Sequence, residues 1–214
     1  MKSTHNTPMN FDRQEYWHDR FTSEKAFEWL VPSAVFMDVL VPCLDRFSSS
    51  SASASAPSQK PRILQIGFGT SNLQNHLRQR GFLAVTNIDY EPLAIERGRQ
   101  LEQEVFGDVR MRYEVADATK LDLPDKYDLV IDKSAADAIS CGGDDGVLAM
   151  AAGVARCLAE GGTWVSLSYS QWRYDYDYTK LPFDVQLITK IPTPKRKETD
   201  PDIFYYCYEL RPTK

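Results

Sequence analysis

The sequence contains few of the residues that metal centres and disulfide frameworks require. It has four cysteines and three histidines in 214 residues. No two cysteines form a CxxC pair and the histidines are scattered along the chain, so the spacing predicts neither a zinc site nor a set of disulfides. We therefore expect no bound metal, and free, buried thiols of the kind found in a reducing compartment.

Long apolar runs and an excess of positive charge are also missing. The first residues lack the apolar stretch of a signal peptide, and no window approaches eighteen apolar residues. We therefore expect a cytoplasmic protein without a membrane partner. Lysine and arginine number 25 against 30 acidic residues, and the formal net charge of −5 argues against a nucleic-acid partner.

A low-complexity stretch divides the chain. Residues 48–61 consist mostly of serine, alanine and proline, too polar to join a core, and predict a flexible linker. We assign residues 1–47 to an N-terminal helical lid segment and residues 62–214 to the core of the same domain. The lid segment is too aromatic for a solvated tail, with Tyr16, Trp17, Phe21, Phe27 and Trp29. We expect it to cover a site and a chain beginning near Lys60 to fold without it.

The remainder of the chain has the pattern of an α/β protein. Apolar runs typical of buried strands alternate with helical patterns from Arg62 to Ser170. Two late runs, at 183–191 and 203–212, are separated by a polar stretch and predict a hairpin. The alternation predicts a doubly wound, mainly parallel, seven-stranded sheet with a Rossmann-like arrangement.

A glycine-rich turn follows the first predicted strand in the stretch ILQIGFGTSNL. Gly67 and Gly69 lie between a strand and a helix, the position at which backbone N–H groups bind a nucleotide-like ligand. A dinucleotide site needs a third glycine beneath the pyrophosphate, and this chain has Asn72 there. S-adenosylmethionine has adenine and ribose but no pyrophosphate. The turn therefore favours this methyl donor over NAD.

Acidic residues follow the next two predicted strands. Asp89 ends the second strand, where a carboxylate can accept both ribose hydroxyls. Asp117 ends the third strand and can accept from the adenine amino group, while the Ala118 N–H reaches a ring nitrogen. Each signal has a structural alternative, since either aspartate alone can cap a helix. Their order at consecutive strand ends supports donor binding.

Four motifs together resemble the class I, seven-stranded S-adenosylmethionine-dependent methyltransferases. The blocks EYWHDRF…AFEWL and YDLVIDKSAADAI are similar to those of the elongation factor 1-alpha lysine methyltransferases, a subgroup that includes methyltransferase-like 13. ILQIGFGTSNL and VTNIDYEPLAIE are similar to the glycine and second-strand motifs of the class. The resemblance implies donor contacts from Trp17, Phe21, Gly67, Gly69, Asp89, Tyr90, Asp117, Ala118 and Lys133.

The same resemblance implies lysine methylation of a protein substrate, such as a translation elongation factor, with S-adenosylhomocysteine as product. We expect a monomer. Asp137 is the candidate to face the acceptor, with helix capping as its alternative. The aromatic and acidic segment 168–178 could hold a cationic lysine or cover the core. Lys133 could bind the donor carboxylate or form an internal ion pair.

Other function classes remain open from the sequence. The chain could methylate a small molecule, or bind S-adenosylmethionine without catalysis. A dehydrogenase would use NAD in the same turn, and a magnesium-dependent methyltransferase would need an acidic cluster, for which Asp132, Asp144 and Asp145 are the available residues. The last two read better as the start of a helix.

Overall fold

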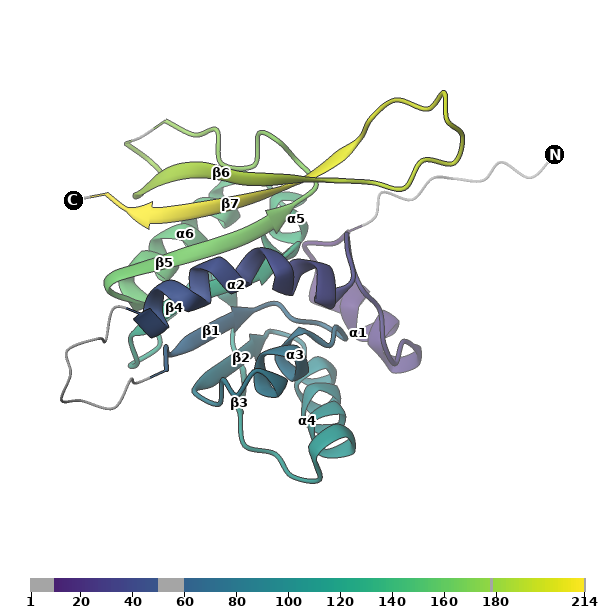
Figure 1. Ribbon diagram of the computed structural model, residues 1–214, viewed down its shortest axis with the longest axis vertical. Coiled ribbons are helices and arrows are strands. Elements are labelled where there is room, and N and C mark those ends of the chain that lie inside the picture. The colour runs from purple at the N-terminus through teal and green to yellow at the C-terminus, as the bar shows by residue number, and fades with distance from the viewer. Residues whose placement is uncertain (1–9, 50–59, 178, 214) are drawn as a thin grey trace.

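The computed structural model describes residues 10–49, 60–177 and 179–213, so most of the predicted linker lies outside the described residues. One seven-stranded sheet forms the centre, in the order β3-β2-β1-β4-β5-β7-β6 (Figure 1). Its strands are β1 Ile63–Ile66, β2 Val85–Asp89, β3 Arg112–Val115, β4 Tyr127–Lys133, β5 Leu158–Ser168, β6 Phe183–Pro192 and β7 Phe204–Pro212.

Helices cover both faces of this sheet. They are α1 Gln14–Ser23, α2 Ser33–Ser49, α3 Leu73–Gln79, α4 Pro92–Phe106, the short 3-10 helix η1 Ala118–Lys120, α5 Ala135–Ser140 and α6 Asp144–Cys157. No helix within the described residues is long and apolar enough to cross a membrane.

The predicted doubly wound sheet and the late hairpin are both confirmed. Strands β1 to β5 pair in parallel, whereas β7 is antiparallel to both β5 and β6. In the parallel part, Ile66 pairs with Ile88 on one side and with Asp132 on the other. The carboxyl ends of β1, β2 and β4 therefore meet at one edge, where ligands of open α/β sheets bind.

Alternate residues of β1 reach opposite faces of the sheet. Ile63 packs in a cluster with side chains of α2 and α3, while Leu64 packs in a second cluster with α6 and Trp164. Both residues are fully buried, as expected for a central parallel strand with helices on both faces.

The position of α2 corrects the predicted lid boundary. We expected the whole segment 1–47 to cover a site and to be dispensable for the sheet. Instead, α2 lies across one face of the sheet (Figure 1), and its buried side chains join the first core cluster. They are Phe36, Met37, Leu40, Cys43 and Leu44, which form one stripe of the helix. A chain beginning near Lys60 would expose this apolar face, so only the residues before α2 remain candidates for a lid.

Truncation of Leu40 tests the role of α2 in the core. Leu40→Ala should lower the free energy of unfolding by about 2–5 kcal/mol, because the fully buried side chain leaves a cavity. Urea unfolding measures the change. Val35→Ala is the matched control on the same helix, since Val35 is 38% exposed, and should change stability by less than about 0.5 kcal/mol. Equal effects of the two changes would place α2 outside the core.

Candidate functional site

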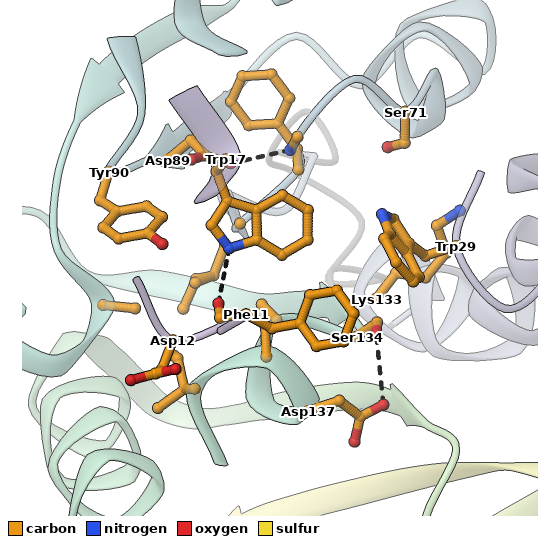
Figure 2. Close-up of a pocket in the computed structure, with 18 of the residues that line it drawn as sticks. Phe11, Asp12, Trp17, Trp29, Ser71, Asp89, Tyr90, Lys133, Ser134 and Asp137 are labelled. Carbon is orange, nitrogen blue, oxygen red and sulfur yellow. Dashed lines mark hydrogen bonds between the residues drawn. The ribbon is translucent and has the colours of Figure 1, made fainter. Parts of the chain in front are cut away.

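A cavity of about 910 Å³ lies at the carboxyl ends of β1, β2 and β4. This volume is near the upper end of the roughly 300–1,000 Å³ typical of ligand sites. Every site residue predicted from the sequence lines it, and Figure 2 shows several of them around the cavity. These residues are Trp17, Phe21, Gly67, Gly69, Asp89, Tyr90, Asp117, Ala118, Lys133 and Asp137. The structure thus brings them together, while their individual roles stay predictions.

The glycine turn after β1 requires its glycines. Gly67 and Gly69 have φ angles of 59° and 55°, which favour glycine because it has no Cβ. A Cβ on Gly67 would lie 2.6 Å from the Cβ of Ala135 at the start of α5. A Cβ on Gly69 would lie 3.3 Å from the ring of Phe21, so the Phe21 ring lies over the turn.

Asp89 lies at the end of β2 beside this turn. Its Oδ2 accepts from the Gly69 N–H at 2.9 Å, and its Oδ1 accepts from the Glu91 N–H at 3.0 Å. Burial raises the pKa of Asp89 to about 6, although these backbone hydrogen bonds lower it. A carboxylate has about four lone-pair sites, so the oriented group retains the capacity to accept from ribose hydroxyls.

The position of Asp117 is compatible with both roles predicted for it, helix capping and contact with adenine. Its Oδ1 accepts from the N–H and the hydroxyl of Thr119 and caps η1. Burial raises the pKa of Asp117, but the hydrogen bonds from Thr119 and Lys120 outweigh it and hold the pKa below its ordinary value. The side chain still lines the cavity beside Ala118. Capping therefore fixes this carboxylate where the adenine was expected.

Residues 10–31, which we call the covering segment, lie over the cavity. The ring centroid of Trp17 lies 5.5 Å from that of Phe21 and 5.8 Å from that of Trp29. The Trp17 indole N–H donates to the Phe11 carbonyl at 2.7 Å. Figure 2 shows Trp17 and Phe11 together in the lining. The rings form one connected aromatic layer on the outer side of the site.

Polar contacts hold the covering segment to the loops of the site. The Gln14 amide donates to the Tyr90 carbonyl at 2.7 Å, after β2. At the glycine turn, the Thr70 hydroxyl donates to the Glu24 carboxylate at 2.8 Å. The segment therefore touches both the expected ribose loop and the turn.

The cavity continues to the ends of β4 and β5, in a region we call the transfer end, lined by Glu28, Trp29, Lys133, Asp137 and Tyr169. Lys133 is paired with the Glu28 carboxylate and also donates to the Val31 carbonyl at 3.0 Å. Two roles were predicted for Lys133, binding of the donor carboxylate and an internal ion pair. This structure shows the ion pair.

Asp137 lines the transfer end, but its carboxylate is occupied by donors from the end of β5 and the loop that follows it. It accepts from the Arg173 Nε at 2.8 Å, from the Tyr169 N–H at 2.9 Å and from the Ser168 hydroxyl. Burial raises the pKa of Asp137, against the effect of these donors. The contacts suit a residue that positions the loop carrying Tyr169.

Sequence reasoning missed the roles of Glu28 and Arg173 at the transfer end. Glu28 lies in the block AFEWL and Arg173 in the segment 168–178, and both stretches are rich in aromatic residues. Each is a charged residue within an aromatic stretch. Such a residue indicates a role only when the partner of its charge is known. Of the predicted aromatic segment 168–178, Tyr169 lines the cavity, Tyr174 is buried in the core, and Tyr178 lies outside the described residues.

The lining also fits a polar ligand. Gln65 on β1 lines the cavity, and its buried side-chain oxygen has no hydrogen-bond partner among the described residues. Buried polar atoms are nearly always hydrogen-bonded to protein or ordered water, so this oxygen has the capacity to accept one further donor. Among the described residues, no group of three or more His, Cys, Asp or Glu side chains could hold a metal ion.

Comparison with known proteins agrees with this geometry. Residues 63–162 match a family model described as a methyltransferase domain. The methyltransferase srdJ of Neurospora crassa is 58% identical over 208 residues, which cover 95% of this chain and 84% of that protein. The chain belongs to the methyltransferases. The fold and the family together make it a class I enzyme that uses S-adenosylmethionine as methyl donor.

More distant proteins extend this comparison. The EEF1A lysine methyltransferase 4 of Mus musculus is 27% identical over 186 residues, covering 76% of this methyltransferase and 67% of that protein. The crystal structure of magnesium protoporphyrin IX methyltransferase from Synechocystis, with bound S-adenosylmethionine, has a TM-score of 0.58 at 16% identity. It covers 97% of this chain and 99% of that one, and shows the shared fold.

Replacement of Asp89 tests the ribose site. Asp89→Asn should weaken binding of S-adenosylmethionine by about a hundredfold, because charge-assisted hydrogen bonds to the ribose are lost. Titration calorimetry measures the dissociation constant, with circular dichroism to confirm folding. Asp184→Asn on the exposed strand β6 is the matched control and should leave affinity unchanged. A folded Asp89→Asn variant with the original affinity would remove Asp89 from the donor site.

The pH dependence of donor affinity follows from the same group. With a pKa of about 6, Asp89 protonates as pH falls from 7 to 5, and affinity should decline over that range and not in Asp89→Asn. Because the pKa is raised in the folded state, protonation of Asp89 favours folding as pH falls through 6. A decline in donor affinity therefore reflects protonation of Asp89 in the site. It does not reflect unfolding caused by that protonation. Constant affinity from pH 7 to 5 would contradict the assignment.

Removal of the covering segment tests whether it acts as a lid. A chain that begins at Pro32 keeps α2 and should fold, but should lose most donor affinity because the aromatic layer is gone. A chain that begins at Asn10 keeps the covering segment and is the control. Calorimetry measures affinity, and tryptophan fluorescence of the full chain should change on donor binding. If the Pro32 chain binds the donor as well as the Asn10 chain, the segment only packs.

Proposed function

We propose that this methyltransferase transfers the methyl group to the side-chain amine of a lysine in a protein substrate, with a translation elongation factor as the first candidate. The proposal concerns the acceptor only, since the donor is given by the family. We also propose that the enzyme acts as a monomer in the cytoplasm. The buried free thiols Cys43, Cys157 and Cys207 are compatible with that reducing compartment.

The charge and aromatic character of the transfer end carries the proposal. Rings of Trp29 and Tyr169 line this end, and those of Phe11 and Tyr205 line the same cavity. Among its described lining residues Lys133 is the one lysine or arginine, and Glu28 neutralises it. Aromatic faces attract cations, so the wall suits an amine that arrives protonated.

The likeness to the mouse EEF1A lysine methyltransferase supports the same acceptor class. It covers most of both chains, but its identity of 27% is low enough for the substrate to differ. The relative with 58% identity is described as a methyltransferase without a stated acceptor. The support for lysine therefore comes from the transfer end together with the more distant relative.

The proposed reaction requires little from the protein beyond alignment. Bound donor supplies a methyl group on a sulfonium, and the amine nitrogen forms a bond to that carbon as the carbon–sulfur bond breaks. The amine loses a proton to water before it attacks. In this proposal Asp137 positions the loop of Tyr169, and the covering segment excludes water from the site.

Labelled donor identifies the acceptor. The protein is incubated with S-adenosylmethionine labelled on its methyl group and with cell lysate, and mass spectrometry locates the labelled residue. Lysine methylation should rise as pH increases from 7 to 9, because only the neutral amine attacks and the side chain of free lysine has a pKa of about 10.4. Asp89→Asn, with its weakened donor binding, is the control and should give much less label.

Other outcomes of this experiment would overturn the proposal. Label only in the small-molecule fraction would make the chain a small-molecule methyltransferase. Binding of the donor without any labelled product would make it a binding module. A rate that is constant between pH 7 and 9, with chemistry limiting, would indicate an oxygen acceptor.

A further inference from the structure

The order of the strands determines which end of the donor approaches Lys133. Along β3-β2-β1-β4, the residues expected to hold adenine follow β3, and the ribose carboxylate ends β2. The sulfur and the methionyl group of the donor then extend over the ends of β1 and β4. Lys133 is the last residue of β4, and Figure 2 shows it beside Trp29, across the cavity from Tyr90.

Glu28 is held at this end by donors from different elements. Its Oε1 accepts from the Ser33 hydroxyl at 2.6 Å, at the start of α2, and from the Asn72 N–H at 3.1 Å, just before α3. Its Oε2 pairs with Lys133 at the end of β4. The carboxylate is therefore fixed by the core, although Glu28 belongs to the covering segment.

An unpaired Lys133 would oppose the chemistry of this end. Its side chain is 5% exposed, so water screens its charge weakly. A buried ammonium here would repel the donor sulfonium and any protonated amine. With the Glu28 carboxylate in contact, the pair is neutral, and Asp137 at the same end is paired with Arg173.

We propose that Glu28 is a specificity-determining residue: by holding Lys133 in an ion pair, it cancels the Lys133 charge and lets the transfer end accept positively charged groups. The donor sulfonium is one such group, and the proposed effect on it follows from the established donor. A protonated amine acceptor is the other, and the proposed effect on it rests on the proposed function. Glu28 thereby favours the substrate donor over its product, which lacks the charge at sulfur.

S-adenosylmethionine and S-adenosylhomocysteine provide a direct probe, because they differ by the methyl group and its positive charge at sulfur. Calorimetry on the full chain gives the ratio of their dissociation constants. Glu28→Gln should raise the S-adenosylmethionine to S-adenosylhomocysteine ratio about tenfold, which corresponds to about 1.4 kcal/mol. Lys133→Met keeps the Glu28 charge and should lower that ratio. The double variant should return it toward the original value.

The ratio of the two dissociation constants distinguishes this proposal from a purely structural role of Glu28. Glutamine at position 28 can still accept from Ser33 and Asn72, so the covering segment should remain docked. If Glu28→Gln weakens both ligands equally, Glu28 is only an anchor and the proposal is wrong. Should Glu28→Gln fail to fold, Lys133→Met alone decides, and an unchanged ratio there overturns the proposal.

A further control excludes competition for Lys133. If Glu28 only competes with the donor carboxylate, Glu28→Gln should tighten both ligands equally and leave 5′-methylthioadenosine, which has no carboxylate, unaffected. That result would also overturn the proposal. None of these measurements uses an acceptor, so failure of the lysine assignment leaves the outcome unchanged.

Discussion

The close contact between Gly67 and Ala135 is the constraint on which the site depends. It joins the turn after β1 to the start of α5, and no side chain fits between them, since a Cβ on Gly67 would lie 2.6 Å from that of Ala135. The positive φ of the turn directs the Gly69 N–H at the Asp89 carboxylate. Glycine at this point therefore shapes the cavity lining and orients the Asp89 carboxylate.

Around this floor, the structure uses charged groups for position as much as for chemistry. Asp117 caps η1, Asp137 holds the loop after β5, and Glu28 joins the covering segment to β4 and α3. Each of these carboxylates lines the cavity and is already hydrogen-bonded. Contacts within the protein therefore orient these side chains, and such preorganisation reduces the ordering cost of binding.

The N-terminal part of the chain serves two purposes that its sequence does not separate. Helix α2 completes the core on one face of the sheet, whereas residues 10–31 cover the cavity through an aromatic layer. Both stretches contain large apolar or aromatic side chains and precede the same low-complexity stretch. The difference arises from the surfaces they meet: α2 packs on buried strand residues, and the covering segment lines the cavity.

The sequence by itself determined the sheet, the glycine turn, the strand-end carboxylates and the donor. These features depend on local patterns, such as apolar runs, glycine at a turn and acidic residues directly after strands, so they can be read along the chain. Only the tertiary structure decided the place of α2, the Glu28–Lys133 pair and the contacts of Asp137 with Arg173. Those partners are 105 and 36 residues apart in the two ion pairs. Their pairing depends on which elements meet in the fold, and no local pattern specifies that.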